Sequence, residues 1–85
     1  MEQSEAIVVY STSWCGDCKR ARMVLDSKNI NYKIIDLELH PHAEEEMLKV
    51  NGGIWRVPTI ILPTGKVLVE PSVNELLAAL EGRAA

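Results

Sequence analysis

The chain has 85 residues and a mass of 9.5 kDa, which leaves room for one domain with one small hydrophobic core. Hydrophobic residues make up 47% of the chain and charged residues 25%, close to globular averages, so a disordered or collagen-like chain is excluded. The net charge of −3 argues against a nucleic-acid-binding surface, and no apolar run approaches the ~20 residues of a membrane helix.

The first five residues are polar and acidic, unlike the positively charged and then apolar start of a secretory signal. We therefore expect a cytoplasmic protein. We predict a single domain over residues 1–85, with its folded core at about residues 5–80.

The first half of the chain predicts two strands, each followed by a helix. Residues 6–10 form a β-branched run that predicts a buried strand, and residues 32–37 predict a second one. From Cys15 to about Ser27, apolar residues recur with helical spacing. Another helix is predicted from about Pro41 to Val50, since proline suits the first helical position and acidic residues follow it.

The second half predicts a hairpin and a last helix. Residues 59–62 and 66–69 read as strands, and the short Pro-Thr-Gly connection between them implies an antiparallel pair. Ser72 and Glu75 form a capping box, which predicts a helix starting there, with an apolar stripe that packs into the core.

This element order predicts an α/β fold with a four-stranded mixed sheet flanked by three helices. The first two strands are expected to be parallel, joined by a right-handed helical crossover. The hairpin extends the same sheet, and the helices cover both of its faces.

Cys15 and Cys18 are the only cysteines, and three interpretations compete. A structural disulfide over so short a loop would contribute little stability and is rare in the cytosol. A zinc site would need a second ligand pair, and the only candidates, His40 and His42, are too close in sequence and are expected to face water. A redox dithiol requires Cys-x-x-Cys between a strand and a helix, which is the predicted setting.

The position of the two cysteines also predicts their roles. Only a thiolate attacks a disulfide, and the free N–H groups and positive dipole of a first helical turn stabilise an anion at Cys15. Cys18 lies one turn deeper on the inward face, so it is expected to be a shielded thiol. We therefore predict that Cys15 is the nucleophile and that Cys18 is the resolving thiol. Trp14 is either a flat platform beside this site or a half-buried aromatic residue.

Three features together resemble the glutaredoxin family of the thioredoxin fold. They are Trp-Cys-Gly-Asp-Cys at residues 14–18 after the first strand, Val57-Pro58 before the third strand, and the short C-terminal helix. The resemblance implies a thioredoxin-like fold, a cis Val57–Pro58 bond and a disulfide reductase that takes a small thiol off a mixed disulfide through Cys15. The redox-active Cys15–Cys18 disulfide would then serve in place of a bound cofactor, and the backbone of Val57 would pair with an extended substrate.

Within that family, the closest likeness is to the mycoredoxins, glutaredoxin-like proteins of actinobacteria. It rests on residues 12–16, 51–53, 57–59 and 71–72. This resemblance implies mycothiol as the small thiol, with glutathione and bacillithiol as the other candidates, and disulfide-containing proteins as the other partners. We expect a monomer that binds no nucleic acid, membrane or metal.

Several residues depart from the pattern of glutathione-binding members. Residues 70–72 read Glu-Pro-Ser where a Gly pair and an Asp usually open the last helix, and this weakens the case for glutathione. Arg56 stands where a Thr is typical, and it either clamps a substrate carboxylate or is a surface charge. The candidate substrate-binding residues are Trp14, Arg56, Val57, Pro58 and Ser72.

Two other functions compete with this prediction. One is a redoxin that takes electrons from a thioredoxin-reductase-like enzyme and donates them to ribonucleotide reductase, since such proteins share the fold and lack the glutathione site. The other is a zinc or iron–sulfur module that uses both cysteines.

Overall fold

The computed structural model describes residues 6–82. The two ends of the domain predicted for residues 1–85, including the polar N-terminus, lie outside the described residues. Seven elements follow in the predicted order: β1 (Ile7–Ser11), α1 (Gly16–Ser27), β2 (Tyr32–Asp36), α2 (Ala43–Val50), β3 (Thr59–Ile61), β4 (Val67–Val69) and α3 (Val73–Gly82).

The four strands form one mixed sheet in the order β2-β1-β3-β4. β1 runs parallel to β2 and antiparallel to β3, and β3 pairs antiparallel with β4. Val9 sits at the centre of this sheet, opposite Ile34 on one side and Ile60 on the other. The predicted parallel crossover and the hairpin are both confirmed.

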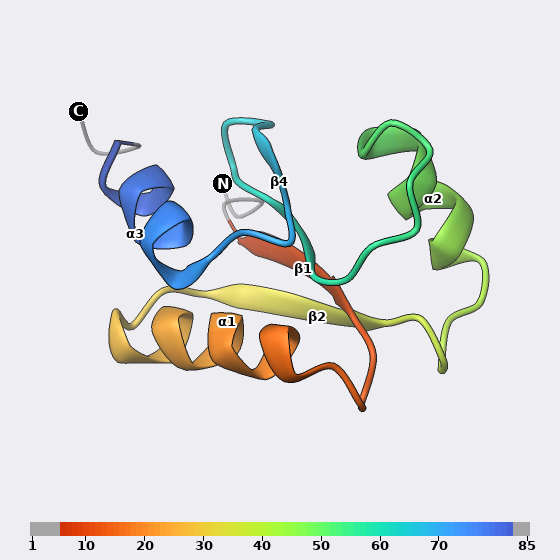
Figure 1. Cartoon of the computed structure of the whole chain (residues 1–85), viewed down its shortest axis with the longest axis horizontal. Coiled ribbons are helices and arrows are strands. Elements are labelled where there is room, and N and C mark those ends of the chain that lie inside the picture. The colour runs from red at the N-terminus through yellow and green to blue at the C-terminus, as the bar shows by residue number, and fades with distance from the viewer. Residues whose placement is uncertain (1–5, 83–85) are drawn as a thin grey trace.

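The helices cover both faces of the sheet, and Figure 1 shows α2 well apart from α1 and α3. Alternate residues of β1 explain this arrangement, because successive side chains of a strand point to opposite faces. Ile7 and Val9 join a buried cluster with residues of α1 and α3. Tyr10 joins a second cluster that contains Ala43 and Met47 of α2.

The start of α2 differs from the prediction, because the helix begins at Ala43 and not at Pro41. The N–H groups of Ala43 and Glu44 donate to the carbonyls of His40 and Pro41, each three residues back. Pro41 therefore lies in a tight turn that precedes the helix. His42 occupies the N-cap position of α2, and its side chain makes no capping hydrogen bond there.

Other boundaries shift by a residue. β1 extends to Ser11, which is opposite Asp36 and whose carbonyl accepts a hydrogen bond from Leu37 N–H. The capping box at α3 is confirmed: Ser72 N–H donates to Glu75 Oε1 (2.8 Å), and Glu75 N–H donates to Ser72 Oγ (3.1 Å). Among residues 6–82, no helix is both long and apolar enough to cross a bilayer.

Candidate active site

Cys15 lies at the N-cap of α1, directly after the loop that leaves β1. Its backbone is extended (φ −86°, ψ 111°), and its Sγ accepts a hydrogen bond from the N–H of Cys18 at 3.1 Å. The sulfur therefore takes the place that a Ser or Asp oxygen takes in an ordinary helix cap. Its side chain is half-buried, and the residue lines a groove at the surface. The predicted placement at the opening of a helix is confirmed.

Cys18 lies one turn deeper and is only 1% exposed. Burial raises the pKa of the Cys18 thiol to about 12, and its hydrogen bond with Cys15 adds to the shift. Burial disfavours the charged form of a thiol, so Cys18 is protonated at neutral pH and gains its negative charge only as the pH approaches that value. The two sulfurs thus lie in different environments, one at the surface of a helix start and one in the core.

This difference predicts the alkylation pattern of the reduced protein. At pH 8, iodoacetamide is expected to add one carbamidomethyl group per native chain, at Cys15. Cys18 is expected to be spared, because its thiol is buried and its pKa is raised to about 12, so it stays protonated at pH 8. Intact-mass measurement with peptide mapping checks this, and protein unfolded in guanidinium should take up two groups. A second adduct on the native chain at pH 8 would contradict the burial of Cys18.

The loop before β3 brings Val57 against Cys15. The Val57–Pro58 peptide bond is cis, as predicted. The side chains of Val57 and Pro58 are buried, while the Val57 carbonyl oxygen lies 3.6 Å from Cys15 Sγ and accepts its hydrogen bond. Among the described residues, the Val57 N–H has no hydrogen-bond partner. The backbone of this residue therefore lies next to the Cys15 sulfur.

A groove of about 290 Å³ opens beside Cys15. It is lined by residues from the two loops that meet there: Trp14, Cys15, Gly16, Asp17, Trp55, Arg56, Val57 and Glu70. Trp14 is 65% exposed and stacks on Trp55, with ring centroids 6.2 Å apart and planes within 15°. Trp14 is thus an exposed platform beside the site. Trp55 was not among the predicted site residues, although it is next to Arg56 in the sequence.

The charged groups of the groove are already paired within the chain. Arg56 Nε lies 3.2 Å from Glu70 Oε1, and Asp17 forms an ion pair with Arg20. Glu70 was not predicted as a site residue; its backbone adopts a left-handed conformation (φ 46°). Arg56 lines the groove, but its guanidinium is already paired with the Glu70 carboxylate.

Not all of the predicted residues line the groove. Pro58 is buried and does not line the groove, and Ser72 is at the cap of α3, outside the groove lining. His40 and His42 are exposed, as expected. Among the residues that the structure describes, no three His, Cys, Asp or Glu side chains gather closely enough to hold a metal ion together.

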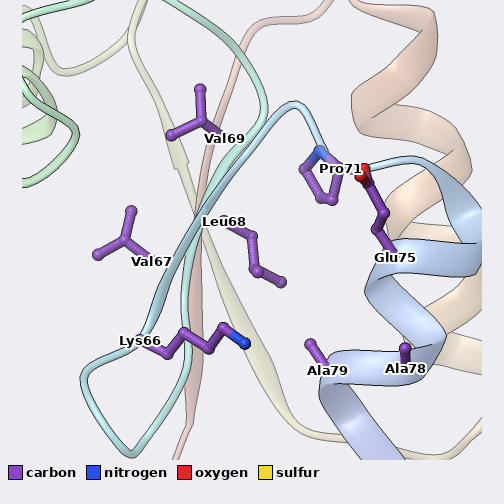
Figure 2. Close-up of a pocket in the computed structure, with 8 residues that line it drawn as sticks. All are labelled: Lys66, Val67, Leu68, Val69, Pro71, Glu75, Ala78 and Ala79. Carbon is purple, nitrogen blue, oxygen red and sulfur yellow. The ribbon is translucent and has the colours of Figure 1, made fainter.

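A second hollow, of about 450 Å³, lies between β4 and α3. Figure 2 shows Lys66 and Leu68 on its strand side, facing Glu75, Ala78 and Ala79 on its helix side. It contains neither cysteine and none of the groups that surround Cys15. The groove beside Cys15 is therefore the candidate active site.

Comparison with known sequences gives a consistent family match. The family model described as Glutaredoxin matches residues 7–67. A Mycobacterium tuberculosis protein named "Putative glutaredoxin Rv3198A" is 40% identical over 75 residues, which are 88% of this chain and 89% of that protein.

Solved structures show the same fold. The glutaredoxin grx-1 of Archaeoglobus fulgidus superposes with a TM-score of 0.79 at 19% identity, covering 92% of this chain and 88% of that one. The holo form of glutaredoxin C1 from Populus tremula x tremuloides gives a TM-score of 0.68 at 23% identity, with coverages of 93% and 78%.

Proposed function

Because the chain belongs to the glutaredoxin family of thiol–disulfide oxidoreductases, we propose that it reduces mixed disulfides between proteins and a small thiol. The observation that carries this proposal is the hydrogen bond from Cys18 N–H to Cys15 Sγ at the start of α1. Backbone donors and the positive end of the helix dipole stabilise a negative sulfur at this position. We place this activity in the cytoplasm, where thiols are kept reduced.

In the proposed reaction, the Cys15 thiolate attacks the small-thiol sulfur of the mixed disulfide. The old S–S bond breaks, the protein substrate leaves as a thiolate that takes a proton from water, and Cys15 holds the small thiol in a new disulfide. A second small-thiol thiolate can attack that thiol's sulfur, which restores the Cys15 thiolate and releases the oxidised small-thiol dimer. Overall, the mixed disulfide and one free small thiol become the protein thiol and the small-thiol dimer.

Cys18 provides a second route by which the mixed disulfide between Cys15 and the small thiol can be resolved. Once deprotonated, it attacks Cys15 Sγ, releases the small thiol and closes the Cys15–Cys18 disulfide, which a reductant must then reopen with two electrons. Its high pKa, about 12, keeps it protonated while Cys15 reacts first. The order of the two steps therefore follows from the difference in environment between the two sulfurs.

The groove supplies the contacts for the substrate. The backbone of Val57, with its carbonyl 3.6 Å from Cys15 Sγ, is placed to pair with an extended segment of the substrate. The stacked rings of Trp14 and Trp55 offer a flat apolar wall against which the substrate can pack.

The charges of the groove favour a small thiol of the mycothiol type. Glutathione and bacillithiol both carry carboxylates, whereas mycothiol is a sugar-linked cysteine derivative with none. In this groove, Glu70 pairs with Arg56, so the guanidinium is not free to bind an incoming carboxylate. A mixed-disulfide reduction assay run in parallel with the three thiols tests this proposal. Faster reduction by thioredoxin reductase and NADPH than by mycothiol would overturn it in favour of the redoxin alternative.

Glu70→Gln is expected to shift this preference toward glutathione. The change removes one negative charge and frees the Arg56 guanidinium for a substrate carboxylate. An exposed pair of this kind contributes about 0.2–1 kcal/mol, so the ratio of kcat/KM for glutathione to that for mycothiol should rise by about 1.4- to fivefold.

The matched control for this variant is Glu81→Gln, which removes the same charge from an exposed position near the end of α3. Equal kcat/KM ratios in the Glu70→Gln variant, the control and the wild type would show that Glu70 does not set the preference.

A further inference from the structure

The loop that carries Trp55, Arg56 and Val57 has no helix or strand to hold it. It follows the end of α2 and joins the sheet only at Thr59, where β3 begins. Three of its residues line the groove beside Cys15. Some other contact must therefore fix their positions.

Asn51, the C-cap residue of α2, supplies that contact. Its side-chain Nδ2 donates to the carbonyl of Ile54 at 2.6 Å, and its Oδ1 accepts the N–H of the same residue at 3.2 Å. The side-chain amide thus pairs with both polar groups of one backbone residue. Trp55, which stacks on Trp14, is the next residue in the chain.

Two further hydrogen bonds hold the backbone on the other side of Trp55. Asn51 Nδ2 also donates to Thr59 Oγ1 at 3.2 Å, and the Thr59 hydroxyl donates to the carbonyl of Arg56 at 2.9 Å. Thr59 is fully buried, which shields its hydroxyl from water. The backbone is therefore pinned at Ile54 and at Arg56, on both sides of Trp55.

We propose that Asn51 is a positioning residue for thiol–disulfide exchange, which sets the place of the loop from Trp55 to Val57 against Cys15. This inference rests on the proposed function for its kinetic test, but not for its structural one. Among the described residues, the Asn51 side chain bonds to Ile54 and Thr59 and to neither sulfur, so it acts on the substrate through the loop. Misplacement of a binding group by about 1 Å can lower the rate a hundredfold.

The chemistry of the side chain explains why an amide is required. The amide donates and accepts at once, whereas an ionised carboxylate only accepts. In an Asn51→Asp variant both donated bonds are lost, and a negative oxygen faces the Ile54 carbonyl at the place of the 2.6 Å contact. The loop is then expected to move away, together with Trp55 and Val57.

The test compares Asn51→Asp with Asn74→Asp, which makes the same chemical change at an exposed position of α3. For the mixed-disulfide substrate, Asn51→Asp is expected to lower kcat/KM about tenfold, mainly through a higher KM. The rate at which iodoacetamide labels Cys15 should stay within about twofold, because the Cys18 N–H still donates to Cys15 Sγ when the weak 3.6 Å contact with the Val57 carbonyl is lost. Asn74→Asp should match the wild type in both measurements.

Tryptophan spectra give a readout that does not depend on activity. The chain has two tryptophans, and both belong to the stacked pair, so Asn51→Asp should change the near-ultraviolet circular dichroism and the emission maximum. If the wild type reduces no mixed disulfide, the proposed function fails, and this spectrum still decides whether Asn51 holds the loop. Wild-type spectra and KM in Asn51→Asp would overturn the inference, as would an equal loss of Cys15 labelling.

Thr59 provides a second pair of variants if Asn51→Asp does not fold. Thr59→Val keeps the shape of the side chain but breaks the bond to the Arg56 carbonyl, and it is expected to raise KM as Asn51→Asp does. Thr59→Ser keeps the hydroxyl and should restore a KM close to that of the wild type. Equal KM values for Thr59→Val and Thr59→Ser would refute the role of this hydrogen-bonded chain.

Discussion

Cys15→Ser is expected to lower the rate of mixed-disulfide reduction by about a thousandfold or more, since loss of a nucleophile has effects of this size in other enzymes. A serine hydroxyl at the N-cap of α1 can still accept the Cys18 N–H, so the helix start is preserved. The hydroxyl, however, is not ionised at neutral pH and cannot form a disulfide. The loss should therefore appear in kcat and not in the folding of the chain. The measurement is steady-state reduction of a protein mixed disulfide, with far-ultraviolet circular dichroism to confirm the fold.

Residual activity is the informative outcome for this variant. Cys18 remains in Cys15→Ser, but it is buried and its pKa is raised in the wild type, so it is not expected to replace the lost nucleophile. A variant with more than about a tenth of wild-type activity would show that Cys18 or another group attacks the substrate. The assignment of Cys15 as nucleophile would then have to be abandoned.

The order and pairing of the strands could be predicted from the sequence because the physical signals are local. The β-branched run before the cysteines, the helical spacing after them and the Pro-Thr-Gly turn each indicate one element, and general rules of connection then leave few topologies. The predicted start of α2 was wrong because a proline at position 41 suits both a first helical turn and a tight turn. The hydrogen bonds from Ala43 and Glu44 to residues three back decide between the two, and they are not visible in the sequence.

The cysteines could be placed in the same way, since Cys15 caps a helix that the apolar spacing already indicated. The residues that form the walls of the groove could not be predicted in this way. Trp14 and Trp55 stack although they belong to loops far apart in the chain, and Glu70 reaches Arg56 from the end of β4. Such contacts depend on how the loops fold over the edge of the sheet. The one local hint was the position of Trp55 beside Arg56 and Val57, and it was too weak to assign a role.

Cys18→Ser is expected to separate the two routes of the proposed reaction. Removal of a small thiol from a mixed disulfide needs only Cys15, so its rate should stay within a few-fold of the wild type. Reduction of a disulfide within a protein substrate should fall by about a hundredfold or more, because no second thiol is left to release the substrate from Cys15. The variant should instead accumulate as a covalent adduct with the substrate, visible as an added mass that dithiothreitol removes.

The Cys18→Ser variant also tests how the position of Cys18 affects Cys15 and the stability of the fold. Its backbone N–H donates to Cys15 Sγ, so Cys18→Ser leaves that hydrogen bond in place. A polar hydroxyl in a site that is 1% exposed should cost about 1–3 kcal/mol of stability if it finds no partner, which thermal unfolding will show separately. If both routes were lost to the same extent in a variant that remains folded, Cys18 would be acting on the reactivity of Cys15 itself, and the division of labour between the two sulfurs would be refuted.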